Sequence, residues 1–156
     1  ITLLRGVTRL QGLMVEPGNP KHINGIEDIK RSDLSYVNRQ KGAGTRILLD
    51  YLLKQNGISR EQINGYTREE MTHLSVAVQI ASHSANLGMG IYSAAKAYHL
   101  DFIPVCNEHY DFLMTNSFHE SELFPIFQSV IMSKAFKDRL ESMGGYQIDH
   151  IGDVLF

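Results

Sequence analysis

The stretch that decides the fold is YVNRQKGAGTRILLD, which runs from Tyr36 to Asp50. Its first residues, with Ser35 before them, predict a short strand over 35–38. A loop with two glycines follows over 39–45. Apolar residues then recur at helical spacing until Gly57 ends the helix. The segment therefore predicts a strand, a loop and a helix in immediate succession.

A strand–loop–helix of this kind suits an anion. The start of a helix leaves backbone N–H groups unpaired and carries a partial positive charge. Glycines let the backbone approach a ligand, a hydroxyl can donate a hydrogen bond, and arginines supply full charge. The residues that would take part are Arg39, Gly42, Ala43, Gly44, Thr45 and Arg46. The alternative reading is a tight turn in which Thr45 merely caps the helix.

Two well-known phosphate loops are excluded by the same residues. The loop lacks the Lys-Ser/Thr pair that follows the second glycine of a Walker loop. It also lacks the G-x-G-x-x-G spacing of the dinucleotide fingerprint.

Strands and helices alternate on both sides of this segment. Strands are expected over 10–15, 35–38, 63–66, 87–90, 102–106 and 110–115. Helices are expected over 26–30, 45–56, 72–84, 93–98, 120–132 and 134–143. The helix over 72–84 is apolar on most of its faces, which predicts a buried helix. The alternation predicts an α/β fold with a mostly parallel, doubly wound sheet.

Composition narrows the function classes. A net charge of −2 gives no support to a nucleic-acid surface, and no run approaches the roughly 20 apolar residues of a membrane helix. No signal peptide is visible at the start of the chain. The single cysteine, Cys106, excludes an internal disulfide and a cysteine metal site and fits a reducing compartment. The seven histidines are scattered, so no metal cluster is expected.

Catalytic residues are not expected either. Acid–base residue types occur at 69–70 and 108–111, but adjacent positions do not indicate a constructed site. No Ser-His-Asp arrangement is legible, and Cys106 ends an apolar strand, where burial is the better reading than nucleophilic attack.

Residues 36–50 closely resemble a signature of the periplasmic-binding-protein-like domain attached to molybdopterin-biosynthesis proteins and helix-turn-helix regulators. Further segments resemble other blocks of that family: 11–13 with 17–21, 66–74, 100–111 and 144–146. The resemblance runs from about Gln11 to Tyr146 and implies a type 2 periplasmic-binding-protein fold.

The family more distantly resembles molybdate and tungstate binders. In the tungstate binders a strand leads into an arginine, and a threonine six positions later opens a helix. Arg39 and Thr45 stand at that spacing. The resemblance implies that Arg39 and Thr45, with backbone groups of Ala43, Gly44 and Thr45, line one wall of an oxyanion pocket between two lobes. It also implies Tyr110, from the late block, as a ligand-binding residue.

The sequence departs from the family pattern in two ways. The family domain includes an earlier half-lobe before the crossing strand, and this chain starts just short of that strand. The resemblance thus implies one partial domain over 1–156, with a complete second lobe over about 12–105 and a return to the first lobe over 106–156. In addition, Asn86 stands where the family usually carries an aspartate.

The functional expectation is binding or sensing of molybdate, tungstate or a related oxyanion, without catalytic residues, metal or other cofactor. One alternative is part of an enzyme that inserts molybdenum into molybdopterin, and another is an interaction domain that has lost its ligand. Expected partners are the oxyanion, a fused DNA-binding or molybdopterin-biosynthesis domain, and a second copy in a homodimer, with no membrane. The single cysteine and the family resemblance point to the cytoplasm.

Overall fold

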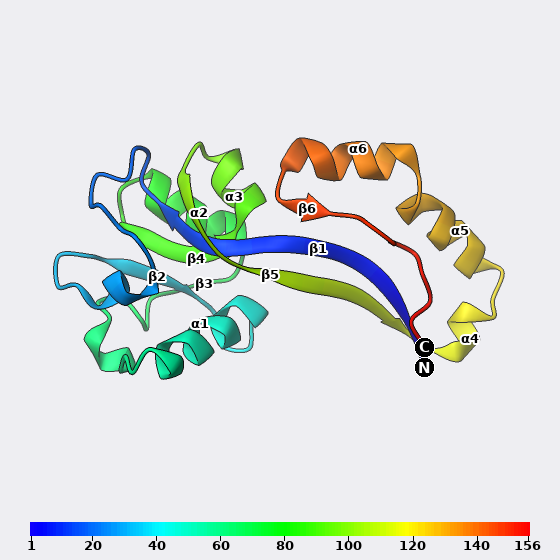
Figure 1. The fold of residues 1–156 in the computed structure, drawn as a ribbon, viewed down its shortest axis with the longest axis horizontal. Helices are drawn as coiled ribbons and strands as arrows, with labels where there is room; N and C mark the ends of the chain where they lie inside the picture. Colours follow the sequence, from blue (N-terminus) through cyan, green and yellow to red (C-terminus); the bar gives the residue numbers. More distant parts are fainter. The chain divides into compact units, whose positions relative to one another are not determined.

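The computed structural model describes residues 1–156, which divide into two compact units. Unit 1 contains residues 1–10 and 107–156, and unit 2 contains residues 11–106. Strands β1 (Thr2–Val15) and β5 (Asp101–Met114) run through both and are hydrogen-bonded neighbours, as Figure 1 shows. No helix is both long and apolar enough to cross a membrane.

β1 and β5, the two crossing strands, both differ from the sequence prediction. β1 was expected over 10–15 only, and β5 as two separate strands. The polar residues that suggested a break in β5 are paired with β1 instead: Arg9 Nε donates to Glu108 Oε2 at 2.7 Å, and Thr8 Oγ1 lies 3.1 Å from His109 Nδ1. Pairing with a distant strand therefore keeps the polar segment extended.

Unit 2 is built on β2 (Tyr36–Arg39), β3 (Glu69–Glu70) and β4 (Leu87–Ile91), joined by the crossing strands in the order β3-β2-β4-β1-β5. The β2–β3 and β2–β4 pairs are parallel. The β1–β4 pair is antiparallel, with Gln11 opposite Ile91. The predicted α/β class is confirmed, and the parallel part of the sheet is β3-β2-β4.

The strand predicted over 63–66 is wrong. Those residues form a turn, and β3 lies just after it. Gly65 has φ +100°, and a Cβ there would lie 2.0 Å from the carbonyl oxygen of Tyr36. Ile63 and Tyr66 are nevertheless buried, which explains their strand-like apolar pattern.

Helices cover both faces of the sheet in unit 2 (Figure 1): α1 (Gly44–Gln55) on one, and α2 (His73–Ala81) with α3 (Tyr92–Ala97) on the other. Short 3-10 helices lie at Ile26–Lys30 and Arg60–Gln62. Adjacent strand residues supply the two cores, as period-two alternation requires. Leu13 packs on the α1 side and Met14 on the α2 side.

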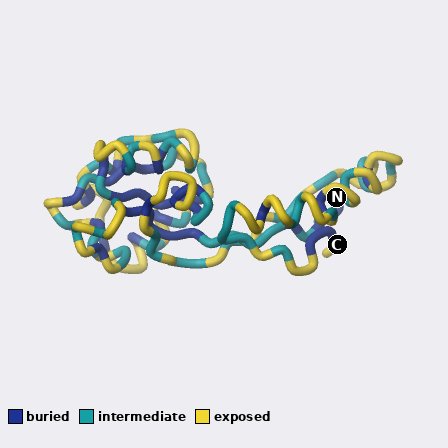
Figure 2. The backbone as a smooth tube through the Cα atoms, turned by 90° about the horizontal axis from the view of Figure 1, so that it is seen from above, coloured by how far each residue is buried: buried dark blue, intermediate teal, exposed yellow.

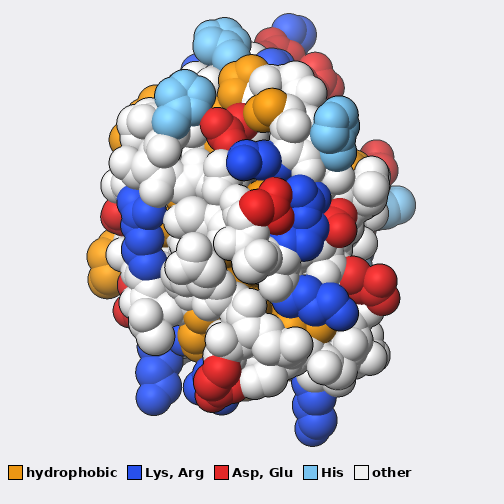
Figure 3. Space-filling view, turned by 90° about the vertical axis from the view of Figure 1, so that its left-hand side faces the viewer, with side chains coloured by type: hydrophobic (Ala, Val, Ile, Leu, Met, Phe, Trp, Pro, Cys, Tyr) orange, Lys and Arg blue, Asp and Glu red, His pale blue; other side chains and the backbone are white.

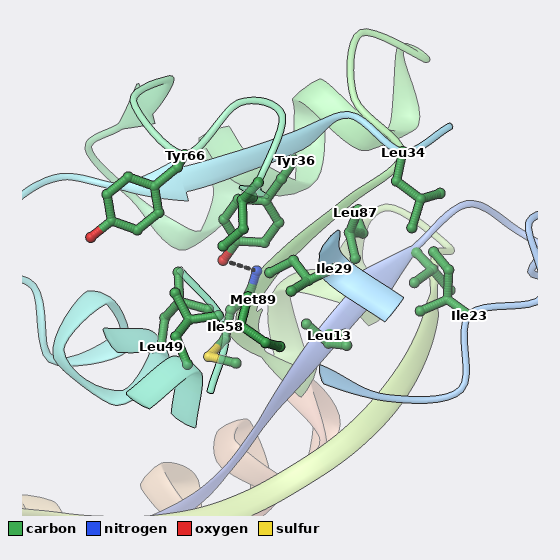
Figure 4. Packing of buried hydrophobic residues seen from close by; sticks show 13 residues of the cluster. Leu13, Ile23, Ile29, Leu34, Tyr36, Leu49, Ile58, Tyr66, Leu87 and Met89 are labelled. Carbon is green, nitrogen blue, oxygen red and sulfur yellow. Dashed lines mark hydrogen bonds between the residues drawn. The ribbon is translucent and has the colours of Figure 1, made fainter. Parts of the chain in front are cut away.

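The core beneath α1 contains a buried polar contact. Figure 4 shows Tyr36 among the aliphatic side chains, with its hydroxyl oxygen accepting the Met89 N–H at 3.3 Å. Burial raises the pKa of Tyr36, so its hydroxyl remains neutral at ordinary pH.

In the core on the α2 side of the sheet, the burial of α2 differs from the prediction of a helix buried on most of its faces. Val76, Ala77 and Ile80 are buried, whereas Leu74 and Val78 are exposed. The helix packs against one layer only, so its second apolar face remains uncovered within unit 2.

Unit 1 has a smaller core. It contains β6 (Tyr146–Gln147), which pairs with β1, and helices α4 (Asn116–His119), α5 (Leu123–Ile131) and α6 (Lys134–Met143). Its buried residues are Leu4, Phe124, Ile131 and Ile151, with edge-to-face aromatic contacts around them. Figure 2 shows the contrast: buried segments are more extensive in unit 2, where exposed loops and helix surfaces enclose them.

Candidate functional site

The loop between β2 and α1 ends at the carboxyl edge of the parallel strands. Ala43 is the N-cap of α1 in extended conformation, and no side chain caps the first turn. Gly42 has φ +91° with open space where a Cβ would stand, and no acidic residue lies in the first turn. The alternative reading of Thr45 as the N-cap is wrong, because Thr45 lies one residue inside the helix.

Thr45 is buried and has a side-chain partner. Only 3% of the residue is exposed, and its hydroxyl donates to Gln11 Oε1 at 2.8 Å. Gln11, at 1% exposure, belongs to β1. Sequence reasoning did not select Gln11 as a site residue. The available signal was an isolated amide at the start of an apolar strand, where a buried polar group needs a partner.

Arg39 ends β2 and precedes the loop. Its Nε donates to Gln40 Oε1 at 3.0 Å, and Nη2 donates to the carbonyl oxygen of Met71 at 3.3 Å. Met71 directly precedes Thr72, the N-cap of α2. The Arg39 guanidinium therefore lies between the loop that starts α1 and the segment that starts α2.

The Arg46 side chain has a structural role instead. Its Nη1 donates to the carbonyl oxygen of Arg39 at 2.9 Å and to Glu69 Oε1 at 3.0 Å. Its guanidinium also lies 4.4 Å above the ring of Tyr66. Burial lowers the pKa of Arg46, but the hydrogen bonds to Tyr66 and Glu69 outweigh burial and leave the pKa raised. Because this charge is already neutralised by Glu69, the expectation that Arg46 supplies charge to an anion is replaced by a structural role.

Tyr110 lies in unit 1, on β5, and half of it is exposed. The Arg9 guanidinium stands 4.6 Å above its ring and is paired with Glu108. Of the predicted ligand-binding residues, Arg39, Ala43, Gly44 and Thr45 therefore lie together in unit 2, and Tyr110 belongs to unit 1.

Asn86, the departure from the family pattern, lies away from this loop. It precedes β4, whose first residue, Leu87, pairs with Tyr36 at the start of β2. The loop with Gly42 follows the other end of β2. The Asn86 substitution thus belongs to the amino edge of the parallel strands and leaves the candidate site unchanged.

A second candidate lies farther along α1. A surface hollow of about 390 Å³ is lined in part by Asp50, Lys54, Arg60 and Glu61. Two acidic and two basic side chains line it, so it offers no net charge to an anion. The face drawn in Figure 3 likewise shows acidic and basic side chains interspersed. The first turn of α1, in contrast, contains no acidic residue.

Comparison with known proteins agrees with this architecture. A family model described as a PBP superfamily domain matches residues 1–132. The chain belongs to the periplasmic-binding-protein superfamily. The periplasmic-binding-protein resemblance expected from the sequence is thereby confirmed at the level of the superfamily.

One curated relative is the uncharacterised protein YvgK of Bacillus subtilis strain 168. It is 35% identical over 153 residues, which are 98% of this chain and 49% of YvgK. The chain therefore spans about half the length of that relative.

Two similar solved structures show the same fold. Peb3 of Campylobacter jejuni bound to L-phospholactate has a TM-score of 0.63 and is 15% identical in sequence. The match covers 93% of this chain and 68% of Peb3. A second structure, described as the substrate-binding domain of a putative molybdenum ABC transporter from Clostridium difficile, also has a TM-score of 0.63. The sequences are 11% identical, and the match covers 93% of this chain and 66% of the transporter domain.

Proposed function

We propose that this domain binds a small oxyanion of the molybdate or tungstate class at the start of α1. The observation that carries the proposal is the first turn of α1, which no side chain caps and which follows the open loop at Gly42. Unpaired N–H groups at such a turn are natural donors to an anion. Arg39, at the end of the preceding strand, supplies the full positive charge.

The position of the loop supports the same conclusion. In open α/β sheets, ligands bind outside the carboxyl ends of the parallel strands. β2 is the central strand of the parallel part, between β3 and β4, and the loop follows its carboxyl end. Backbone donors and a charged side chain are therefore placed where this sheet geometry favours a ligand.

The proposed class of anion rests on similarity to known proteins. Arg39 and Thr45 have the spacing of the tungstate binders, and one structural neighbour is described as part of a putative molybdenum ABC transporter. Another neighbour holds L-phospholactate, which is also anionic. Molybdate and tungstate are our first candidates, and phosphate-containing anions form the comparison class.

We further propose that, in a longer protein, the bound state is passed to a fused DNA-binding or molybdopterin-biosynthesis domain. YvgK is about twice as long as the matched region, which leaves room for a further part in a longer protein.

The test is calorimetric titration of the protein with molybdate, tungstate, sulfate, phosphate and L-phospholactate. We expect molybdate and tungstate to bind most tightly. Arg39→Ala should weaken binding about tenfold or more, because a charged hydrogen bond is lost. Thr45→Val should weaken it less, because it removes one neutral donor and keeps the backbone N–H groups.

Lys41→Ala is the matched control, because it removes an exposed positive charge from the same loop. A loss equal to that of Arg39→Ala would mean general charge attraction instead of a site. If none of the five anions produces heat with the unmodified protein, the proposal fails and an interaction domain becomes the better account.

A further inference from the structure

Within the proposed site, the Thr45 side chain is hydrogen-bonded to Gln11. The Thr45 hydroxyl has one hydrogen, and this hydrogen is donated to Gln11 Oε1 at 2.8 Å. An oxyanion without protons needs the same hydrogen, since it offers only acceptor oxygens. Gln11 and the anion therefore compete for a single donor.

We infer that Gln11 is a positioning residue that lowers the affinity of the α1 site for unprotonated oxyanions by holding the Thr45 hydroxyl hydrogen. The inference rests on the proposed function. Gln11 comes from β1, 34 residues from Thr45 in sequence, so the pair also links the start of α1 to a crossing strand.

Burial makes this competition costly. Gln11 is 99% shielded and Thr45 is 97% shielded, so water does not readily replace a lost partner. When the hydrogen turns to an anion, Gln11 Oε1 must find another donor or remain unsatisfied. Part of the binding free energy is spent on this exchange.

Removing the amide should therefore improve binding. Gln11→Leu fills a buried position with a side chain of similar size and leaves the anion as the acceptor for Thr45. We expect molybdate affinity to rise about three- to tenfold, the effect of one neutral hydrogen bond. Met14→Leu, the control, changes a buried β1 residue on the other face of the sheet and should leave affinity unchanged.

A double-mutant cycle separates this role from a merely structural one. In the Thr45→Val background there is no hydroxyl hydrogen to hold, so Gln11→Leu should change affinity less than twofold. Each variant is also unfolded thermally without anion, so that loss of folded protein is not mistaken for loss of affinity.

The outcomes are distinct. A rise in affinity with Gln11→Leu that disappears in the Thr45→Val background supports the inference. Unchanged or weaker binding by folded Gln11→Leu, or an equal effect in both backgrounds, overturns it while leaving the anion site standing. Absence of binding by the unmodified protein overturns the proposed function and this inference together.

Discussion

Asn86 Nδ2 donates a hydrogen bond to Glu16 Oε1 at 2.8 Å, which joins the residue before β4 to the residue after β1. The other end of the same amide, Oδ1, accepts the Ser35 N–H at 2.8 Å. An amide is suited to both bonds, since it has one donor end and one acceptor end. An aspartate, the residue that the family resemblance implies here, has no donor for Glu16 when ionised.

Asn86→Asp should destabilise the protein at pH 7 by about 1–3 kcal/mol, because a hydrogen bond becomes a contact between two carboxylates. Near pH 4 the loss should be smaller, since one carboxyl of the pair can hold a proton and donate it. Urea unfolding at both pH values measures the difference. The same loss at pH 4 and pH 7 would show that charge repulsion is not the cause.

Glu16→Gln should remove part of the pH dependence of stability. Burial raises the pKa of Glu16, but hydrogen bonds from Asn86 and His83, with the nearby Lys21 charge, outweigh burial and lower it below its usual value of 4.5. A carboxyl with a depressed folded-state pKa stabilises the protein above the unfolded-state pKa. This contribution is lost as the pH falls through the folded-state value.

The unmodified protein should therefore exceed Glu16→Gln in stability at about pH 5.5, with the gap narrowing as the pH falls below about 4.5. Unfolding free energies measured from about pH 5.5 to about pH 3 provide the comparison. A gap that widens over this range as the pH falls would contradict the assigned direction of the pKa shift.

Gly88→Ala should destabilise unit 2 by about 1–3 kcal/mol through overpacking. A Cβ at Gly88 would lie 2.6 Å from Val76 Cγ1 on α2 and 2.8 Å from the carbonyl oxygen of Val37 on β2. Gly25→Ala is the control: no atom lies within 4 Å of its Cβ position, and its backbone is extended. Thermal unfolding should separate the two variants, and equal melting temperatures would refute the close packing at Gly88.

Arg46→Met should cost about 1–3 kcal/mol, because the carbonyl oxygen of Arg39 and the hydroxyl of Tyr66 lose a donor. The partly exposed Glu69 remains solvated and adds little. Lys54→Met, on the exposed side of the same helix, should change stability by less than about 0.5 kcal/mol. Chemical denaturation of the two variants tests the structural role of Arg46, and equal small effects would argue against it.

Local periodicity was sufficient to predict the helix and strand bounds of the central segment. The strand predicted over 35–38 and the helix predicted over 45–56 correspond to β2 and α1 within one residue. α3 and α6 also lie where apolar spacing indicated. These elements are short-range products of residue type and spacing, which a sequence carries directly.

Long-range contacts decided the length of β5 and the roles of the two arginines. The full length of β5 depends on pairing such as Arg9 with Glu108, 99 residues apart in sequence. The roles of the two site arginines differ because Arg46 meets Glu69, 23 positions away, whereas Arg39 turns toward Met71.

The sequence by itself determined the α/β alternation, the family and the loop that starts α1. Only the tertiary structure decided that Thr45 donates to Gln11 rather than capping its helix. A hydroxyl has one hydrogen, and its acceptor is whichever group the fold brings within reach. Sequence spacing could place Thr45 at the start of a helix but could not place Gln11 beside it.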